Sequence, residues 1–127
     1  MIDKTNSIYT KVKNAIISLC ESGSQTYTAM PSKFPHMYFK TVNNYGIAYD
    51  TDNNENAVNS TIEIAIYTTG INKLTLARKI SVLVSEEMRL LGFQRMFGFQ
   101  EIVNVSDTNL CQILARYNRI IASEDNV

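Results

Sequence analysis

The amino-acid sequence predicts an α+β fold, in which a mostly antiparallel sheet of about five strands carries two helices packed on one face. Two observations lead to this prediction. Hydrophobic residues recur with the period of a helix near the start and in the middle of the chain, and elsewhere they alternate with the period of a strand. With 127 residues, 45% of them hydrophobic, the chain has the size of one domain with its own core. We therefore expect a single domain over residues 1–127, with frayed ends at about 1–4 and 123–127.

The two helices are predicted over residues 5–21 and 72–91. Gly23 is a suitable point for the first to end, and Gly92 is placed for the left-handed residue that follows the second. Asn72 is the expected N-cap of the second helix. The predicted buried positions of the first helix are Ile8, Val12, Ala15, Ile16 and Leu19. Those of the second are Leu76, Ala77, Ile80, Leu83, Val84, Met88 and Leu91.

Strands are predicted on both sides of the second helix. Two short ones, QTYTAM (25–30) and HMYFKTV (36–42), are separated by the prolines of PSKFP. In STIEIAIYT (60–68) Ile62, Ile64 and Ile66 share one face, and we expect Ile64 to be fully buried under the helices. The last two strands, 94–105 and 110–122, are expected to form an antiparallel hairpin through the turn SDTN.

A polar run, NNYGIAYDTDNNENAVN (43–59), leads into the strand at 60–68. Read as a calcium loop, it would offer Asp50, Asp52 and Asn54 as the first three ligands. The required glycine is replaced by Glu55, and the final bidentate glutamate by Thr61. We therefore interpret the run as an extended loop that is available for contact with a neighbouring protein.

The residues that could carry out catalysis or bind a metal are few and scattered. His36 is the only histidine, so a two-histidine zinc site cannot form. Cys20 and Cys111 lie in apolar surroundings, and we interpret them as small buried side chains and not as a disulfide. Glu86 and Glu87 diverge by about 100° around a helix axis, so they cannot face each other as acid and base. We expect no enzyme activity, no cofactor and no metal.

The balance of charge bears on the partners of the protein. Twelve basic and twelve acidic side chains cancel, which does not favour nucleic acid as the main ligand. The start of the chain lacks the pattern of a secretory signal, and no stretch approaches the roughly 20 apolar residues that span a bilayer. The expected location is a cytosol, without membrane contact.

Two arginines of the last strand are candidates for contact with another subunit. Arg116 and Arg119 lie on opposite faces of that strand, where they are either solvated or paired with carboxylates of a neighbour. Glu55 and Glu63 are the acidic candidates for the same interface. Strands of about ten residues also leave main-chain edges that need protection.

Five segments carry a resemblance to a known family, in this order: IYTKVKNAIIS, FPHMYFK, NNENAVNSTIEIAIYT, ARKISVLVSEEMRLLGFQR and ARYNRII. Together they span roughly residues 8–121. Gly92, Phe93 and Arg95 after the second helix, and Arg116 and Tyr117 in the last strand, carry most weight. In this order the segments resemble the small tail-terminator or tail-completion proteins of phages, prophages and phage-tail-like particles of Gram-positive bacteria.

The resemblance implies a structural protein that forms a ring, typically a hexamer, on the end of a completed tail tube. The ring stops polymerisation of the tube and offers a surface to the head connector. Implied partners are further copies of the chain, the tube protein, and sheath and head-connector proteins, while DNA only passes through the lumen. The protein would be made in the host bacterial cytoplasm and then join a virion or tail-like particle. A head-to-tail connector or stopper remains an alternative, as does a small-molecule-binding α+β module.

Overall fold

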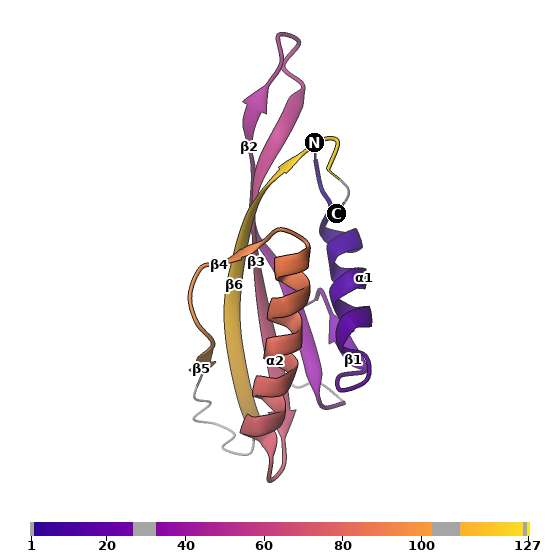
Figure 1. Cartoon of the computed structure of the whole chain (residues 1–127), viewed down its shortest axis with the longest axis vertical. Coiled ribbons are helices and arrows are strands. Elements are labelled where there is room, and N and C mark those ends of the chain that lie inside the picture. Colours follow the sequence, from indigo (N-terminus) through magenta and orange to yellow (C-terminus); the bar gives the residue numbers. More distant parts are fainter. Residues whose placement is uncertain (1, 27–32, 103–109, 126) are drawn as a thin grey trace.

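The structure, a computed structural model, describes residues 2–26, 33–102, 110–125 and 127. Its elements follow the chain in the order α1 (Thr5–Ile16), β1 (Ser22–Ser24), β2 (His36–Tyr49), β3 (Glu55–Thr69), α2 (Lys73–Leu90), β4 (Gln94–Arg95), β5 (Gln100–Ile102) and β6 (Leu110–Ala122). The strands form one sheet, and both helices lie on the same face of it (Figure 1). The predicted α+β fold is confirmed, with six strands in the described part of the chain.

The long strands β2, β3 and β6 form the centre of the sheet. The strand order is β1-β2-β3-β6-β4, and β5 also pairs with β6. Neighbouring strands are antiparallel except β1 and β2, which are parallel. Ile64 lies opposite Phe39 on one side and Ala115 on the other, at the middle of this arrangement.

The hydrophobic core lies between the sheet and the helices. Ile62, Ile64 and Ile66 are all buried in it, as the alternation of β3 predicts, and Ile64 is 2% exposed. Helix α1 contributes Ile8, Val12 and Ile16, and helix α2 contributes Ala77, Ile80, Val84 and Met88. The residues of β3 that face the helices are therefore those that the sequence predicted.

Helix α1 is shorter than predicted. It ends at Ile16 and not at residue 21, because the chain turns there and brings Cys20 into the core, with the Cys20 N–H donating to the Ile16 carbonyl. Ala15, within the helix, and Leu19, beyond its end, were both predicted to be buried but are exposed. Beyond the turn the chain forms β1, which pairs with the start of β2.

Helix α2 matches its prediction closely. It covers Lys73–Leu90, although the Asn72 side chain makes no capping hydrogen bond. Gly92 has a φ of 86°, which is the left-handed conformation expected there. The Phe93 N–H donates to the carbonyl of Met88, and both side chains are buried. This pattern of hydrogen bonds closes the helix end and directs Phe93 into the core.

The prediction that residues 43–59 form an extended loop is wrong. These residues belong to the hairpin of β2 and β3, and only the turn between Tyr49 and Glu55 is irregular. In the turn, the N–H groups of Asp52 and Asn54 donate to Asp50 Oδ1. Tyr45, Ile47 and Tyr49 do alternate with Gly46 and Ala48, but they are exposed and lie among asparagine and aspartate residues, which favoured the loop interpretation.

The remaining strand predictions have mixed outcomes. Most of the strand predicted at 25–30 lies outside the described residues, and the structure has β1 just before it. The pairing of the last two strands is confirmed for β4 and β5 against β6, but the residues between β4 and β5 leave the ladder. There Phe99 packs against the core and the Arg95 guanidinium lies over its ring. The turn SDTN (106–109) is also outside the described residues.

Two described residues near the ends of the chain, Ile2 and Val127, contact the rest of the molecule. The Ile2 N–H donates to Glu55 Oε1, and the Asn44 side chain donates to the Ile2 carbonyl. Ile2 and Val127 are both buried. Figure 1 shows the two ends close together, beside the point where the β2–β3 hairpin leaves the body.

Candidate subunit interface

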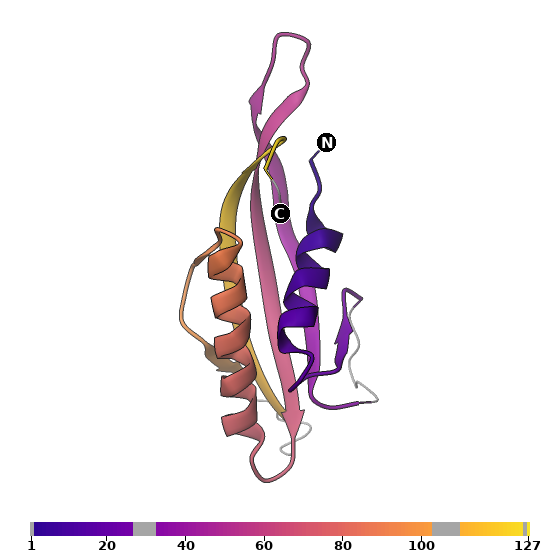
Figure 2. The ribbon, with the colours of Figure 1, turned by 45° about the vertical axis from the view of Figure 1, so that its right-hand side comes forward.

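The outer part of the β2–β3 hairpin projects beyond the rest of the molecule. Strand β3 has 15 residues and helix α2 has 18, which correspond to about 50 Å and about 27 Å of length. The sheet therefore extends well past the helices that cover it, and Figures 1 and 2 show the hairpin standing clear of them. We call residues 45–57, the outermost part of this hairpin, the arm.

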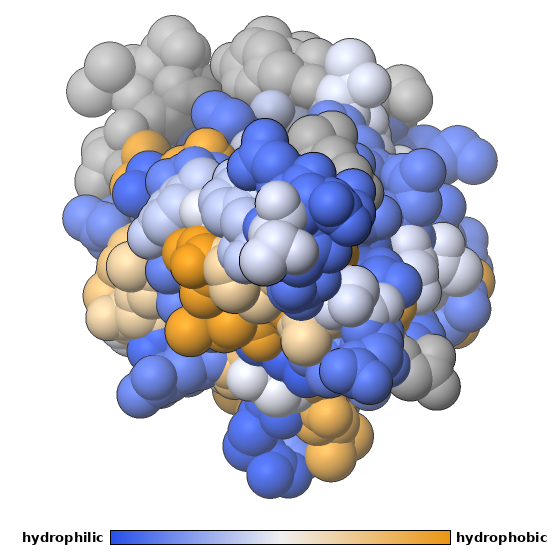
Figure 3. Space-filling model, turned by 90° about the horizontal axis from the view of Figure 1, so that it is seen from above, coloured by the Kyte–Doolittle hydropathy of each residue, from blue (hydrophilic) through white to orange (hydrophobic). Residues whose placement is uncertain are grey.

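The arm exposes large hydrophobic side chains. Tyr45, Ile47 and Tyr49 are 48%, 43% and 54% exposed. Seen from the arm end, hydrophobic residues interrupt a largely hydrophilic surface (Figure 3). A two-stranded hairpin is marginally stable without packing on at least one face, so these side chains favour a further contact of the arm.

Two irregularities of β2 add to this exposed hydrophobic surface. The register of β2 against β3 skips Val42 and Ile47, so each is an extra residue in the ladder. Both side chains are exposed. Bulges twist a strand edge and re-aim side chains, which protects the edge against pairing with another strand. The outer part of β2 is therefore better suited to side-chain contacts than to the addition of a strand.

The arm is acidic. It contains Asp50, Asp52 and Glu55 and no lysine or arginine. Hydrogen bonds from the turn, first from the Asn54 N–H, lower the pKa of Asp50. The Asp50 carboxylate is thus part of the turn, whereas the Asp52 side chain is exposed and makes no hydrogen bond to the described residues.

The four charges predicted for the interface all have partners within their own chain. Glu63 and Arg116 lie opposite each other on β3 and β6, with 3.6 Å between Oε1 and Nε, on the face of the sheet away from the helices. Arg119 donates to the Leu91 carbonyl at the end of α2 and pairs with Asp125 at 3.1 Å. Glu55 accepts the Ile2 N–H. Their contact with another subunit stays a prediction.

Sequence analysis did not anticipate a hydrophobic groove on the helix side of the molecule. The groove, which we call the helix groove, has a volume of about 560 Å³ and lies where the chain after α1 passes α2. It is lined by Leu19, Thr75, Arg78, Lys79, Val82 and Leu83. Leu19 and Leu83 were both predicted to be core residues, but each is partly exposed here. Their hydrophobic character was visible in the sequence, but the early end of α1 that opens the groove was not.

A second pocket, of about 470 Å³, lies between α2 and the segment of β4 and β5. Arg95 Nη1 donates to Ser85 Oγ at its wall, and the Glu86–Arg89 ion pair stands at the surface. The Tyr117 hydroxyl is buried at this pocket. Burial raises the pKa of Tyr117, so this hydroxyl stays protonated near neutral pH.

The polar groups near β1 form a small buried cluster. His36 Nδ1 lies 2.7 Å from Ser22 Oγ, a contact that the sequence did not predict. Burial, with a smaller effect from Lys13, lowers the pKa of His36, so the ring is neutral at neutral pH. The Cys20 thiol donates to the Ser22 carbonyl, and burial raises the pKa of that thiol to about 11. Cys20 and Cys111 are both free and buried, as predicted.

Comparison with known proteins does not assign the chain to a group: no family model matches it, and no curated protein is significantly similar to it. Within the described ranges, no three His, Cys, Asp or Glu side chains come together to hold a metal ion. No helix of the described residues has both the length and the hydrophobicity needed to cross a membrane.

Proposed function

We propose that this chain is a structural protein of a phage tail or tail-like particle, which forms a ring on the end of the tail tube. The ring ends polymerisation of the tube and offers the surface to which the head is joined. The proposal comes from the resemblance of the sequence to tail-terminator proteins. The structural observation that supports it is the arm, because a projecting hairpin with exposed tyrosines and isoleucine is suited to contact with another protein.

A ring follows if the arm contacts a different surface on the next copy. In such a heterologous contact between two copies, one copy keeps a free arm and the other a free receiving surface, so further copies can add. The assembly closes into a ring when the rotation between neighbours is a whole fraction of a full turn. Six copies is the number that the resemblance implies. DNA must pass through the finished ring, so we expect a lumen that is neutral or acidic, since a basic lining would retain phosphates.

The ring is expected to assemble on the tube more readily than in free solution. The hydrophobic surface of one arm is small, and exposed ion pairs contribute only about 0–1 kcal/mol each. Binding to a tube end places the copies side by side and raises their effective concentration. A monomer in dilute solution is therefore compatible with a ring on the tube.

Electron microscopy of particles from a strain that lacks the gene would test the function. We expect tails of uncontrolled length, which a plasmid copy of the gene restores to uniform length. A Tyr45→Ser, Tyr49→Ser variant should fail to restore it. A matched control is Met96→Ser, since Met96 is an exposed hydrophobic residue outside the arm.

The outcomes of this experiment separate the proposal from its nearest alternative. Tails of uniform length that lack heads would indicate a head-to-tail connector. Complete particles with normal tails would contradict a role in tail assembly altogether.

A further inference from the structure

We infer that the arm of one copy of this chain binds in the helix groove of the next copy. The inference rests on the ring of the proposed function and identifies the two surfaces that would build it. The arm, residues 45–57, supplies exposed hydrophobic side chains beside carboxylates. The helix groove supplies a hydrophobic floor beside basic side chains.

The two surfaces match in hydrophobicity. The groove exposes Leu19, Val82 and Leu83, of which Val82 is 58% exposed. The arm presents Tyr45, Ile47 and Tyr49. A volume of about 560 Å³ falls within the roughly 300–1,000 Å³ of ligand pockets, which is room for more than one of these side chains. Contact between the two would remove both hydrophobic surfaces from water.

The two surfaces also match in charge. The arm has three carboxylates and no basic side chain. The residues that line the groove include Arg78 and Lys79 and no acidic side chain. Opposite charges at the rim of an interface orient the partners and disfavour contact between like surfaces. This complementarity identifies a second copy of the chain as the partner, since one chain carries both halves.

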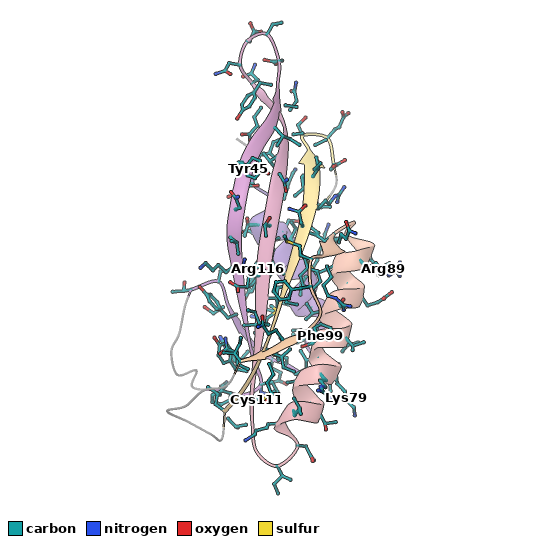
Figure 4. All side chains as sticks on the ribbon, turned by 90° about the vertical axis from the view of Figure 1, so that its left-hand side faces the viewer. Tyr45, Lys79, Arg89, Phe99, Cys111 and Arg116 are labelled. Carbon is teal, nitrogen blue, oxygen red and sulfur yellow. The ribbon has the colours of Figure 1, made fainter. Side chains whose placement is uncertain are left out.

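The positions of the two surfaces require a contact between copies. The arm lies at one end of the long axis of the molecule, whereas Lys79 lies on α2 towards the opposite end (Figure 4). A chain therefore cannot fill its own groove. Because the arm and the groove are different surfaces, each copy can bind one neighbour through its arm and another through its groove, and such a heterologous contact builds a ring when its rotation closes. The bulges at Val42 and Ile47 disfavour the other simple arrangement, in which β2 pairs edge to edge with a neighbour.

Disulfide trapping between two variants, each with one introduced cysteine, tests this contact. Purified Ile47→Cys is mixed with purified Val82→Cys under mild oxidation over a range of concentrations, and the mixed dimer is identified by mass spectrometry. The native Cys20 and Cys111 are buried and are retained. The control is Leu90→Cys, because Leu90 is exposed on the same helix but lies eight residues, or about 12 Å, further along its axis.

We expect the 47–82 dimer to exceed the 47–90 dimer at every concentration at which dimers form. Equal yields of the two dimers, or no dimer of either kind even in the presence of tail tubes, would overturn the inference. A 47–82 dimer that forms only after tail tubes are added would support the inference, because a tube end raises the effective concentration of the copies.

A charge exchange gives a second measurement of the same contact. Asp52→Lys and Lys79→Glu should each reduce the yield of the 47–82 dimer by about fivefold, which is the effect of one exposed ion pair of about 1 kcal/mol. Mixing Asp52→Lys on the arm-side protein with Lys79→Glu on the groove-side protein should restore the yield. If the exchange does not restore it, these two charges do not face each other and the proposed orientation is wrong.

Failure of this inference is distinguishable from failure of the proposed function. If deletion of the gene gives tails of uncontrolled length but the 47–82 dimer does not form, the function stands and the ring is built by other surfaces. If the dimer forms but deletion leaves normal tails, the contact between copies stands and the tail function fails.

Discussion

Replacement of Arg119 on strand β6 should destabilise the fold, although its side chain is partly exposed. Its guanidinium donates to the Leu91 carbonyl at the end of α2, pairs with Asp125 at 3.1 Å, and lies over Gly92. The interaction thus joins the last strand, the end of α2 and the C-terminal segment. Arg116 provides a matched comparison on the same strand, because it makes only a 3.6 Å contact with Glu63.

The size of the effect follows from these contacts. A hydrogen bond from a charged group contributes about 1.5–3 kcal/mol, and a cation at a helix C-terminus adds about 0.3–1 kcal/mol. The side chains of Arg119 and Asp125 are 22% and 31% exposed, so their ion pair adds at most about 1 kcal/mol. Water can hydrogen-bond the groups that lose Arg119 and so recovers part of these contributions. We therefore expect Arg119→Gln to lower the free energy of unfolding by about 2 kcal/mol. Arg116→Gln should cost at most about 1 kcal/mol, since its partner is distant and the side chain is half-exposed.

Urea unfolding followed by far-ultraviolet circular dichroism measures both variants. With a slope of about 2 kcal/mol per molar urea, Arg119→Gln should lower the midpoint by about 1 M and Arg116→Gln by less than about half of that. Equal midpoints for the two variants would refute the reasoning that Arg119 secures the end of α2. The result also bears on assembly, because a stable Arg116 variant can probe subunit contact whereas a destabilised Arg119 variant cannot.

Three further predictions concern the interior. Ile64→Ala should lower the free energy of unfolding by about 2–5 kcal/mol, and Ile64→Asp should not fold; a soluble aspartate variant with an unchanged melting temperature would contradict the burial of this residue. Because burial lowers the pKa of His36, the unfolded chain binds its proton more tightly, so stability should fall as the pH decreases below about 6.5. That loss between about pH 7.5 and about pH 5.5 should be smaller in His36→Gln, and an identical pH dependence in the two proteins would exclude His36 as its source. Cys20 and Cys111 should react with iodoacetamide only after unfolding, since both are buried and burial raises the pKa of both; rapid alkylation of the native protein would show that a thiol is accessible.

The proposed contact between the arm and the helix groove depends on features that the sequence shows only in part. The three carboxylates and the tyrosines of residues 45–57 are visible in the printed chain, as are Arg78 and Lys79 on a predicted helix. Their grouping into two complementary surfaces is not. It depends on the end of α1 at Ile16 and on the length of the hairpin, neither of which was predicted.

The sequence by itself determined the elements whose hydrophobic residues repeat with a clear period. Helix α2, the inward face of β3 and the left-handed Gly92 follow from such local patterns, because a helix or a half-buried strand repeats its contact with the core at fixed intervals. The tertiary structure alone decided the course of residues 43–59, the partners of Glu63, Arg116 and Arg119, and the helix groove. These depend on contacts between residues far apart in the chain. The alternating Tyr45, Ile47 and Tyr49 lie among asparagine and aspartate residues that favour a loop, so local patterns alone did not identify the strand.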